Sequence, residues 1–449
     1  MTDIHYSKTA DEVSLISSGK VNTVQTEERQ LGGLNIFTTC VFIIGVIAGS
    51  GFLTLPKAID DAGWIGFVLI FFCCAISTYT GVILGKCWII VCERNKELTS
   101  HLARYPYPAI GEEAYGKLGR FIVSFSINFT QFGSTVVYIL IAAENIVKLL
   151  PSDTVLNCCY VSLIIGGTIT PFTWLGTPKD FWGIAAAATV ATGTASIILL
   201  VYVLYHEITT DIGEVTHTNI DAITFFTAYG TICFAFNGHP AFPTFQSDMA
   251  KPEKFGNALI LGYFIVLLMY TPSSAAAYFV YGSEVQPNIL QTLPTGPAST
   301  IVSLLMTSHL LFGGVIVINP LLQELEHTFN VPSHFTWKRL VSRTATMALV
   351  MFVAASVPHF SSILSLVGGS TISILAFICP PLFYIKLCRG DEKHSPRYIP
   401  LYIKVLLYEI VFVGLSAGIA ATYSAFKDLI DNQFTVPCYY DPVKACTTS

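Results

Sequence analysis

The chain has 449 residues, of which 53% are hydrophobic and 12% are charged, whereas an ordinary soluble protein has about 25% charged residues. Its formal net charge of -5 gives no electrostatic reason to expect a nucleic-acid partner. The mean hydropathy is +0.61, and the apolar residues form runs of roughly 20 rather than amphipathic stripes. The composition therefore predicts an all-α polytopic membrane protein.

The distribution of polar residues divides the chain into three regions. Residues 1–32 are polar and lack an apolar core, which predicts a disordered cytoplasmic tail rather than a signal peptide. Residues 33–427 hold the apolar runs, and residues 428–449 form a short outer or luminal tail. We expect about eleven membrane spans; in chain order they cover 34–58, 64–91, 120–149, 155–174, 181–205, 221–247, 257–281, 298–323, 343–357, 361–387 and 399–426.

The placement of basic residues predicts the orientation of these spans. Cytoplasmic loops of membrane proteins carry an excess of lysine and arginine. With the N-terminus inside, only Lys57, Lys148, Lys427 and Lys444 of the 24 lysines and arginines fall on the opposite side. The N-terminus is therefore expected to be cytoplasmic and the C-terminus to lie outside or in a lumen.

Four of the twelve cysteines fall on the outer side, where a disulfide can persist: Cys158, Cys159, Cys438 and Cys446. Their spacing does not say which of them pair. No CxxC pair or HExxH helix occurs in the sequence, so we expect neither a metal nor another cofactor.

Two spans are interrupted by poor helix formers. Residues 42–59 read FIIGVIAGSGFLTLPKAI, with Gly49-Ser50-Gly51 in the middle, and the sixth span contains Asn237-Gly238-His239-Pro240. Broken backbone at membrane depth is tolerated where it lines a cavity, and breaks in spans 1 and 6 are typical of a five-plus-five inverted repeat. Close helix packing at glycine and simple proline kinks are the alternatives.

The ends of broken helices suit a zwitterionic ligand. A helix N-terminus presents free N–H groups and a partial positive charge to an anion, while a C-terminus presents carbonyl groups to a cation. A pocket that contains both kinds of end can hold a carboxylate and an ammonium group together. An amino acid carries these two groups.

Three motifs carry a resemblance to a known family. GSGFLTLPKAIDDAGW at 49–64, QFGSTVVYILIAAEN at 131–145 and FAFNGHPAFPTFQSDMAKPEKF at 234–255 resemble signatures of the amino acid/auxin permease family. The third motif is most similar to the vacuolar and vesicular amino acid transporter branch. The resemblance covers residues 30–425 and implies the leucine-transporter fold and secondary active transport of amino acids, commonly coupled to protons and sometimes to sodium.

The resemblance and the breaks together suggest residue roles. We expect the N–H groups of Gly49, Ser50 and Gly51 to bind the substrate carboxylate, because glycine allows close approach. Carbonyl groups around Ile47, Phe234 and Asn237 are expected to bind the ammonium group. Tyr138 is expected to close the site over the substrate, and Phe236, Asn237 and Gly238 complete the substrate-binding candidates. Tyr138 could instead bond a neighbouring helix, and Phe236 could face the core or the lipid.

Titratable residues within spans are candidates for ion coupling. His239 is the first candidate, with a structural role in capping the broken backbone as its alternative. Glu144 is expected to pair with Lys148 one turn later. His309 is a weaker candidate, and Thr307 and Ser308 beside it could hold sodium or simply bond their own helix. We expect H⁺ rather than Na⁺ as the coupling ion.

Taken together, the sequence predicts a secondary active transporter of small amino acids that works by alternating access in a lipid bilayer. A non-transporting amino acid sensor at an intracellular membrane is the alternative, and an enzyme is not expected, because no intramembrane His/Asp/Glu cluster suits catalysis. Residues 11–16, DEVSLI, are similar to an acidic dileucine signal read by sorting adaptors. This signal and the branch resemblance favour an intracellular vesicle or lysosome-like membrane.

Overall fold

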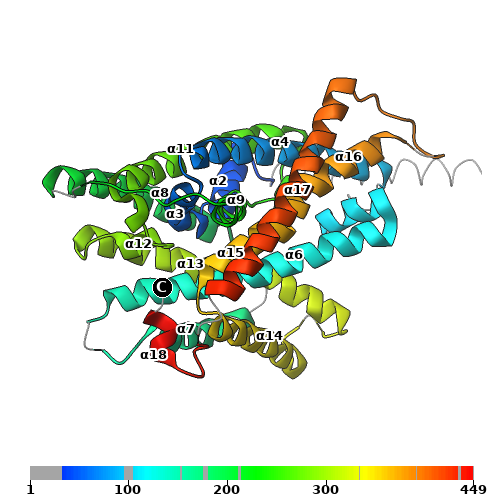
Figure 1. Cartoon of the computed structure of the whole chain (residues 1–449). Coiled ribbons are helices and arrows are strands. Elements are labelled where there is room, and N and C mark those ends of the chain that lie inside the picture. The colour runs from blue at the N-terminus through cyan, green and yellow to red at the C-terminus, as the bar shows by residue number, and fades with distance from the viewer. Residues whose placement is uncertain are drawn as a thin grey trace, which may run out of the picture.

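The computed structural model describes residues 33–95, 105–151, 154–174, 181–210, 214–332, 334–390, 392–432 and 436–447. The N-terminal tail, with the disorder and the sorting signal predicted there, lies outside the described residues. Within the described ranges the regular secondary structure is helical, apart from one isolated β-bridge between Leu34 and Met249. Figure 1 shows the helices and their labels.

Each of the eleven predicted spans has a helical counterpart. The main helices, in chain order, are α2 (Ile36–Ile47), α3 (Gly51–Ala62), α4 (Ile65–Arg94), α6 (Pro106–Leu149), α7 (Cys158–Trp174), α8 (Phe181–Thr209), α9 (Ala222–Ala235), α10 (Phe242–Ser247), α11 (Phe255–Tyr281), α12 (Ile289–Thr292), α13 (Pro297–Thr328), α14 (Trp337–Ser356), α15 (Phe360–Val367), α16 (Cys379–Cys388), α17 (Leu401–Asn432) and α18 (Pro442–Thr447). Among the described residues, eight helices are long and apolar enough to cross a membrane, or nine when the bent pair α2–α3 counts as one, and α7 and α9 are shorter apolar helices.

Both predicted interruptions are present. Helices α2 and α3 meet at an angle of 59° across a break at residues 48–50. Helix α9 ends at Ala235 and α10 begins at Phe242, so residues 236–241 separate them. The helices that precede the two breaks, α2 and α9, are capped at their N-termini. The side chains of Asn35 and Asp221 form capping boxes there, which satisfy free N–H groups.

Two elements differ from the sequence prediction. Helix α6 begins at Pro106 rather than near 120, because a kink at Tyr115 and Gly116 joins a preceding helix to the span; Gly116 has φ 64, a value that favours glycine. The tenth span contains an eleven-residue π-helix, Gly368–Ile378, between α15 and α16. A Cβ atom at Gly368 would collide with the carbonyl group of Gly230, so α9 and this π-helix cross at backbone contact.

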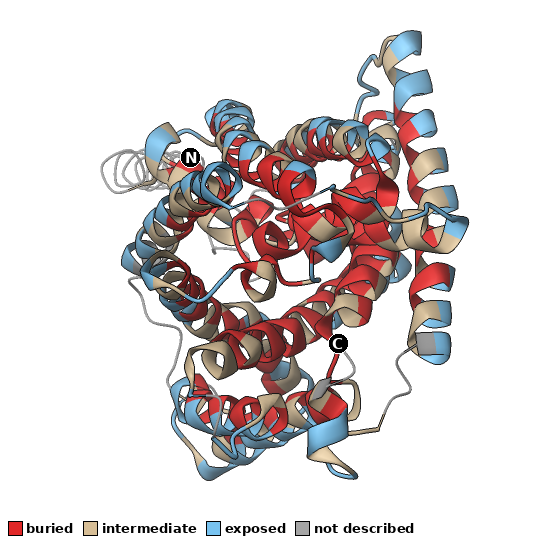
Figure 2. Cartoon of the chain, turned by 60° about the vertical axis from the view of Figure 1, so that its left-hand side comes forward, coloured by how far each residue is buried: buried red, intermediate tan, exposed pale blue. Residues whose placement is uncertain are grey.

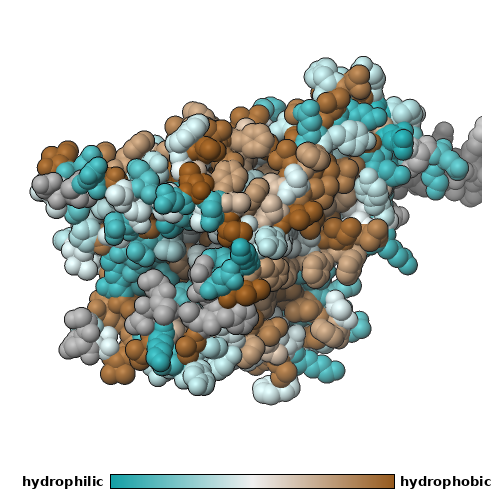
Figure 3. Space-filling view, viewed as in Figure 1, coloured by the Kyte–Doolittle hydropathy of each residue, from teal (hydrophilic) through white to brown (hydrophobic). Residues whose placement is uncertain are grey.

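Burial follows the pattern of a bundle surrounded by lipid. Figure 2 shows buried residues on the inner faces of the helices and exposed residues on their outer faces. Many exposed residues are large and apolar, such as Phe121, Phe125 and Phe412. In Figure 3, hydrophobic side chains gather over the middle of the face that α17 crosses, between hydrophilic groups at either end. A multi-pass membrane protein accounts for this outer surface.

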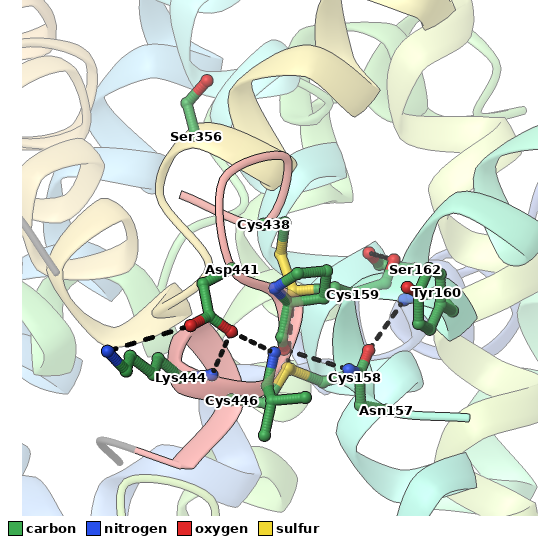
Figure 4. Close-up of a disulfide and its surroundings, with 12 residues drawn as sticks. Asn157, Cys158, Cys159, Tyr160, Ser162, Ser356, Cys438, Asp441, Lys444 and Cys446 are labelled. Carbon is green, nitrogen blue, oxygen red and sulfur yellow. Dashed lines mark hydrogen bonds and ion pairs between the residues drawn. A yellow bond between two sulfur atoms is a disulfide. The ribbon is translucent and has the colours of Figure 1, made fainter. Parts of the chain in front are cut away.

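The four outer cysteines form two disulfides, and Figure 4 shows them. Cys158 pairs with Cys446, and Cys159 pairs with Cys438. The amide of Cys438 also donates a hydrogen bond of 2.8 Å to the carbonyl group of Ala355 at the end of α14. The segment that follows α17 is therefore fixed to α7 and α14.

A buried ion cluster joins α13 and α14 near the ends predicted to be cytoplasmic. Arg343, with none of its side chain exposed, contacts both carboxylate oxygens of Glu326 at 2.5 and 3.1 Å. Arg339 lies 3.2 Å from the same carboxylate, and Arg343 also donates to the carbonyl group of Thr173 at the end of α7. Because a buried carboxylate requires a partner, this cluster holds α7, α13 and α14 in one arrangement.

Candidate functional site

The two helix breaks lie against each other. A Cβ atom at Gly51 would fall directly on the backbone of Ala235, at the end of α9. A Cβ atom at Gly238 would lie 3.0 Å from the side chain of Ile47. The start of α3 thus meets the end of α9, and the end of α2 meets the second break. The two interruptions form one site, as the inverted-repeat interpretation predicts.

Two tyrosines of α11 hold the carbonyl groups of the breaks. The hydroxyl of Tyr270 donates to the carbonyl group of Ile47 at 2.8 Å and lies 3.5 Å from that of Ala235. The hydroxyl of Tyr263 donates to the carbonyl group of Phe236 at 2.9 Å. Both side chains are buried. Sequence analysis missed them, although their spacing of seven residues places both on one face of an apolar helix.

Some of the backbone amides at the breaks already donate a hydrogen bond within the protein, and others do not. The amide of Gly49 donates to the carbonyl group of Ile47 at 2.8 Å, and the amide of Asn237 donates to that of Phe234 at 3.1 Å. Within the described residues, the structure records no backbone hydrogen bond for the amides of Ser50 and Gly51. The free donors are therefore the first two N–H groups of the second half-helix, where a carboxylate is favoured.

Side chains at the breaks add polar atoms with few or no partners. The side-chain oxygen of Asn237 has no hydrogen-bond partner among the described residues, and the fully buried hydroxyl of Ser50 interacts only with the hydroxyl of Tyr138. A buried polar atom without a partner is costly. The Asn237 oxygen is therefore available to a bound ligand. Phe236 instead packs in the core, with its ring 5.7 Å from that of Tyr270, which agrees with the core alternative for that residue.

Tyr138 and His309 approach the first break from two neighbouring helices, α6 and α13. A Cβ atom at Gly49 would lie 2.8 Å from the Tyr138 hydroxyl oxygen on α6 and 3.5 Å from Nε2 of His309 on α13. Both side chains are buried. Glycine at position 49 is required because any larger residue would enter the space between these two polar groups. The structure thus places Tyr138, Gly49 and His309 together.

Thr192 on α8 connects His309 to the same break. Its hydroxyl oxygen lies 2.9 Å from the carbonyl oxygen of Ala48 and 2.9 Å from Nδ1 of His309. Nδ1 also lies 3.3 Å from the carbonyl oxygen of Ala188. Thr192 is fully buried. Sequence analysis did not select it, because a threonine in an apolar helix gives no signal of its tertiary partner.

His239 lies on the other side of the second break. Its Nε2 is 3.0 Å from the hydroxyl oxygen of Thr80 on α4, and its ring packs against Phe242. The side chain is fully buried, and Nδ1 has no partner among the described residues. The contact with α4 matches the structural alternative given for His239, since it fixes the broken backbone to a neighbouring helix.

The expected pairing of Glu144 with Lys148 is wrong. Glu144 accepts a hydrogen bond of 3.2 Å from the side-chain amide of Asn288. Lys148 donates to the carbonyl groups of Leu290 and Leu293. Both side chains therefore fasten α6 to the α12 region, because α12 supplies free carbonyl groups at its end. Glu144 lies six residues after Tyr138 on α6, and its contacts among the described residues do not bring it to the breaks.

Thr307 and Ser308 have different environments. The hydroxyl of Ser308 donates to the carbonyl group of Leu304 in its own helix at 2.8 Å, and the residue is exposed on the outer face. Thr307 is buried, and its hydroxyl oxygen has no partner among the described residues. Ser308 therefore follows the alternative in which the hydroxyl bonds its own helix, and only the Thr307 hydroxyl is left without a partner among the described residues.

A cavity of about 430 Å³ lies between α3, α9, α15 and α17. At one end it is lined by charged side chains: Lys57, Asp61, Asp221, Lys427, Asp428 and Asp431. Thr54 and Thr231 also line it, and each lies one turn from a break. The cavity is on the side predicted to be outer or luminal. It therefore approaches the breaks from that side.

Solved structures share this architecture over most of the chain. MhsT in complex with L-phenylalanine aligns with a TM-score of 0.54 at 13% identity, covering 88% of this chain and 99% of that one. A manganese transporter from Eremococcus coleocola aligns with a TM-score of 0.55 at 12% identity, covering 88% of each. At these identities the likeness establishes the fold alone. The chain therefore has the fold of the leucine-transporter type of membrane protein, with its paired helix breaks.

The chain belongs to the transmembrane amino acid transporter protein family, whose family model matches residues 32–426. Similar curated proteins include the Arabidopsis thaliana amino acid transporters AVT1E, at 28% identity over 86% of this chain and 72% of the relative, and AVT1I, at 24% identity over 90% and 98%. The family is one of transporters and not of enzymes. The amino acid transport expected from the sequence is thereby confirmed at the level of the family.

Proposed function

We propose that this protein carries small amino acids across an intracellular membrane by alternating access, with protons as the coupled ion. The observation that carries the proposal is the contact between the two breaks. There the free amides of Ser50 and Gly51 face a site that also contains the ends of α2 and α9. A helix start for a carboxylate and helix ends for an ammonium group suit the backbone part of an amino acid.

The close packing around the first break favours a substrate with a small side chain. The Tyr138 hydroxyl and Nε2 of His309 stand 2.8 and 3.5 Å from the position that a Cβ atom on Gly49 would take. Fully buried Phe236 and Tyr270 close the neighbouring space. Glycine, alanine, serine and proline are therefore the substrates to test first, with tryptophan as the large comparison.

Alternating access requires one approach to the site at a time. The cavity beside Thr54 and Thr231 supplies an approach from the outer or luminal side. On the predicted cytoplasmic side, α10 packs through Gln246, whose side-chain amide donates to the carbonyl group of Gly85 at 3.1 Å. Movement of α3 and α9 relative to α4 and α11 would exchange the open side.

Protons suit the described groups better than sodium. Na⁺ needs several oxygen ligands, and the Ser308 hydroxyl is already bonded within its own helix. The imidazole group of His309 lies beside the first break, with Nε2 3.5 Å from the Cβ position of Gly49, and histidine changes charge near neutral pH. These features support H⁺ as the coupling ion.

Flux into liposomes tests this proposal. Purified protein is reconstituted, and uptake of labelled alanine is measured with an imposed pH gradient, an imposed Na⁺ gradient or neither. We expect accumulation above equilibrium only with the pH gradient. Saturable binding without flux would favour the amino acid sensor instead, and accumulation driven by Na⁺ alone would exclude the proton.

The compartment is tested separately. The intracellular assignment rests on the branch resemblance and on the DEVSLI segment at residues 11–16. We expect a fluorescently tagged chain to reach an endolysosomal or vacuole-like membrane, and Leu15→Ala/Ile16→Ala to move it towards the cell surface. An unchanged distribution would show that sorting adaptors do not read this segment.

A further inference from the structure

The hydrogen bonds around Thr192 determine where the proton lies on His309. A carbonyl oxygen can only accept a hydrogen bond, so the Thr192 hydroxyl donates to Ala48 at 2.9 Å. Its oxygen must then accept from Nδ1 of His309, also at 2.9 Å. The second neighbour of Nδ1, the carbonyl oxygen of Ala188 at 3.3 Å, is likewise an acceptor.

Both contacts therefore require a hydrogen on Nδ1. In the neutral ring the other nitrogen, Nε2, must then carry a lone pair. Nε2 is the nitrogen nearest to the first break, because it lies 3.5 Å from the Cβ position of Gly49. No hydrogen bond from Nε2 to another described residue is recorded. A basic atom of fixed orientation therefore faces the proposed carboxylate site.

We propose that Nε2 of His309 takes up the transported proton, and that Thr192 is the positioning residue that keeps this atom directed at the substrate. The inference rests on the proposed function, and it names the residue and atom that couple proton to substrate. His309 and Thr192 belong to α13 and α8, so the coupling group lies on helices that do not carry the breaks.

The transported proton binds to one ring nitrogen and leaves from the same nitrogen. A proton from the aqueous phase binds the Nε2 lone pair and gives an imidazolium with one positive charge. Nδ1–H keeps its bond to Thr192, while Nε2–H becomes a donor directed at the carboxylate that the amides of Ser50 and Gly51 hold. Release of the carboxylate on the other side removes this acceptor, and the proton then leaves Nε2. One proton and one zwitterion cross together, with one net positive charge.

Other polar groups around the ring are few. The Tyr138 hydroxyl faces it from α6, the Thr192 hydroxyl and Ala188 carbonyl group from α8, and the Ala48 carbonyl group from the break. The contacts recorded for the ring, among the described residues, involve no carboxylate or cation. The charged groups on α14 that contact α13, Arg339 and Arg343, are bound to Glu326 more than four turns away. Protonation of His309 is therefore balanced by the substrate.

Substitution of His309 by asparagine tests the role of Nε2 separately from that of Nδ1. The asparagine amide can donate in the place of Nδ1–H, so the bond to Thr192 is kept while the basic Nε2 is removed. His239→Gln is the matched control, because it removes a second buried imidazole and keeps a donor towards Thr80. Each purified variant is reconstituted and assayed for accumulation driven by a pH gradient and for alanine exchange without a gradient. Melting temperature checks the fold.

We expect His309→Asn to lower accumulation by about tenfold or more and exchange by only about threefold. Its exchange should lose the part of the parent's pH dependence that comes from protonation of this imidazole. His239→Gln should keep gradient-driven accumulation. Accumulation by His309→Asn at the parent level and pH dependence would overturn the inference, and so would loss of coupling in His239→Gln alone.

Thr192 is tested by a pair of substitutions. Thr192→Val keeps the shape and removes both hydrogen bonds, whereas Thr192→Ser restores the hydroxyl. Ser196→Ala is the control, since Ser196 lies one turn later and donates a similar bond of 2.8 Å to the carbonyl group of Met269. We expect Thr192→Val to shift the pH profile of accumulation, Thr192→Ser to restore it and Ser196→Ala to leave it in place. A profile unchanged in Thr192→Val would remove the positioning role.

Assays of the parent protein distinguish a failure of this inference from a failure of the proposed function. If the parent exchanges alanine but shows no pH-driven accumulation, transport stands and the assignment of a proton to His309 falls. If the parent binds alanine without flux, the proposed function itself falls. A melting temperature of His309→Asn within a few degrees of the parent validates the comparison. If His309→Asn does not fold, His309→Gln replaces it with the same expected loss.

Discussion

The hydroxyl of Tyr270 donates a 2.8 Å hydrogen bond to the carbonyl oxygen of Ile47, the last residue before the first helix break. The same hydroxyl lies 3.5 Å from the carbonyl oxygen of Ala235, the last residue before the second. One side chain of α11 therefore touches both interruptions. It supplies a donor that the missing helical turns would otherwise have provided.

Replacing Tyr270 with phenylalanine should damage the site more than the fold as a whole. The change removes one of the two donors to the Ile47 carbonyl group, which keeps only the Gly49 amide, and the loss of such a hydrogen bond costs about 0.5–1.5 kcal/mol. We expect a lower melting temperature and an affinity for alanine about threefold to tenfold weaker, because the break loses its fixed geometry. Binding to purified protein and thermal unfolding measure both effects.

Tyr278→Phe is the matched control for this prediction. Tyr278 lies two turns further along α11, and its ring packs against Phe67, while the structure records no hydrogen bond for its hydroxyl within the described residues. The same chemical change should therefore leave affinity and melting temperature near the parent values. If the Tyr270 and Tyr278 variants behave alike, the bridge between the breaks contributes nothing.

The sequence predicts the breaks well because their cause is local. Gly49-Ser50-Gly51 and Asn237-Gly238-His239-Pro240 interrupt apolar runs, and poor helix propensity and missing donors act within a few residues. The eleven spans were likewise predictable, since the length of an apolar run is a local property. The contact between the breaks followed only from their positions in spans 1 and 6, through the inverted-repeat pattern.

The parts that sequence reasoning missed depend on contacts distant in the chain. Thr192, Tyr263 and Tyr270 act through carbonyl groups of other helices, and nothing beside them in the sequence marks those partners. Glu326 lies near the end of an apolar span, a place where acidic residues are commonly solvated, but it is buried between Arg339 and Arg343. Local charge patterns cannot reveal whether a helix end is covered by a neighbouring helix.

Gly49 and Gly51 should respond differently to the same substitution. A Cβ atom at Gly49 meets the end of the Tyr138 side chain, which can move, whereas one at Gly51 meets the backbone of Ala235, which cannot. We expect Gly49→Ala to fold with a melting temperature near that of the parent but to weaken alanine binding by about tenfold or more. Gly51→Ala should instead lower the melting temperature.

The double variant Gly49→Ala/Tyr138→Phe is the internal control for this difference. Removal of the Tyr138 hydroxyl takes away the atom that the new Cβ meets at 2.8 Å, so part of the binding should return. Equal losses of stability in Gly49→Ala and Gly51→Ala would show that both glycines serve helix packing alone.

Glu326→Gln should strongly destabilise the protein. Removal of one partner from a buried ion cluster costs about 3–5 kcal/mol, because the remaining charges stay buried without compensation. Arg343, fully buried, and Arg339 would both lose their counter-ion. Yield of monodisperse protein on gel filtration and thermal unfolding in detergent measure the loss.

Glu112→Gln provides the comparison for that variant. Glu112 pairs with Arg120 at 2.6 Å, but both side chains are about half exposed, at 45% and 51%. An exposed pair contributes only about 0–1 kcal/mol. A Glu326→Gln protein as stable as the Glu112→Gln protein would show that the buried cluster does not hold α7, α13 and α14 together.

The two disulfides test the orientation of the chain. Cys158–Cys446 and Cys159–Cys438 can persist only if these residues face an oxidising compartment, as expected if the C-terminus lies opposite an N-terminus that is predicted to be cytoplasmic. After alkylation of free thiols under denaturing conditions, non-reducing mass spectrometry should find these two linked peptide pairs and eight alkylated cysteines. Cys159→Ser/Cys438→Ser should lower the melting temperature, because a bridge closing a long loop contributes about 2–5 kcal/mol. Recovery of all twelve cysteines in alkylated form would contradict both the two disulfides and an odd number of spans.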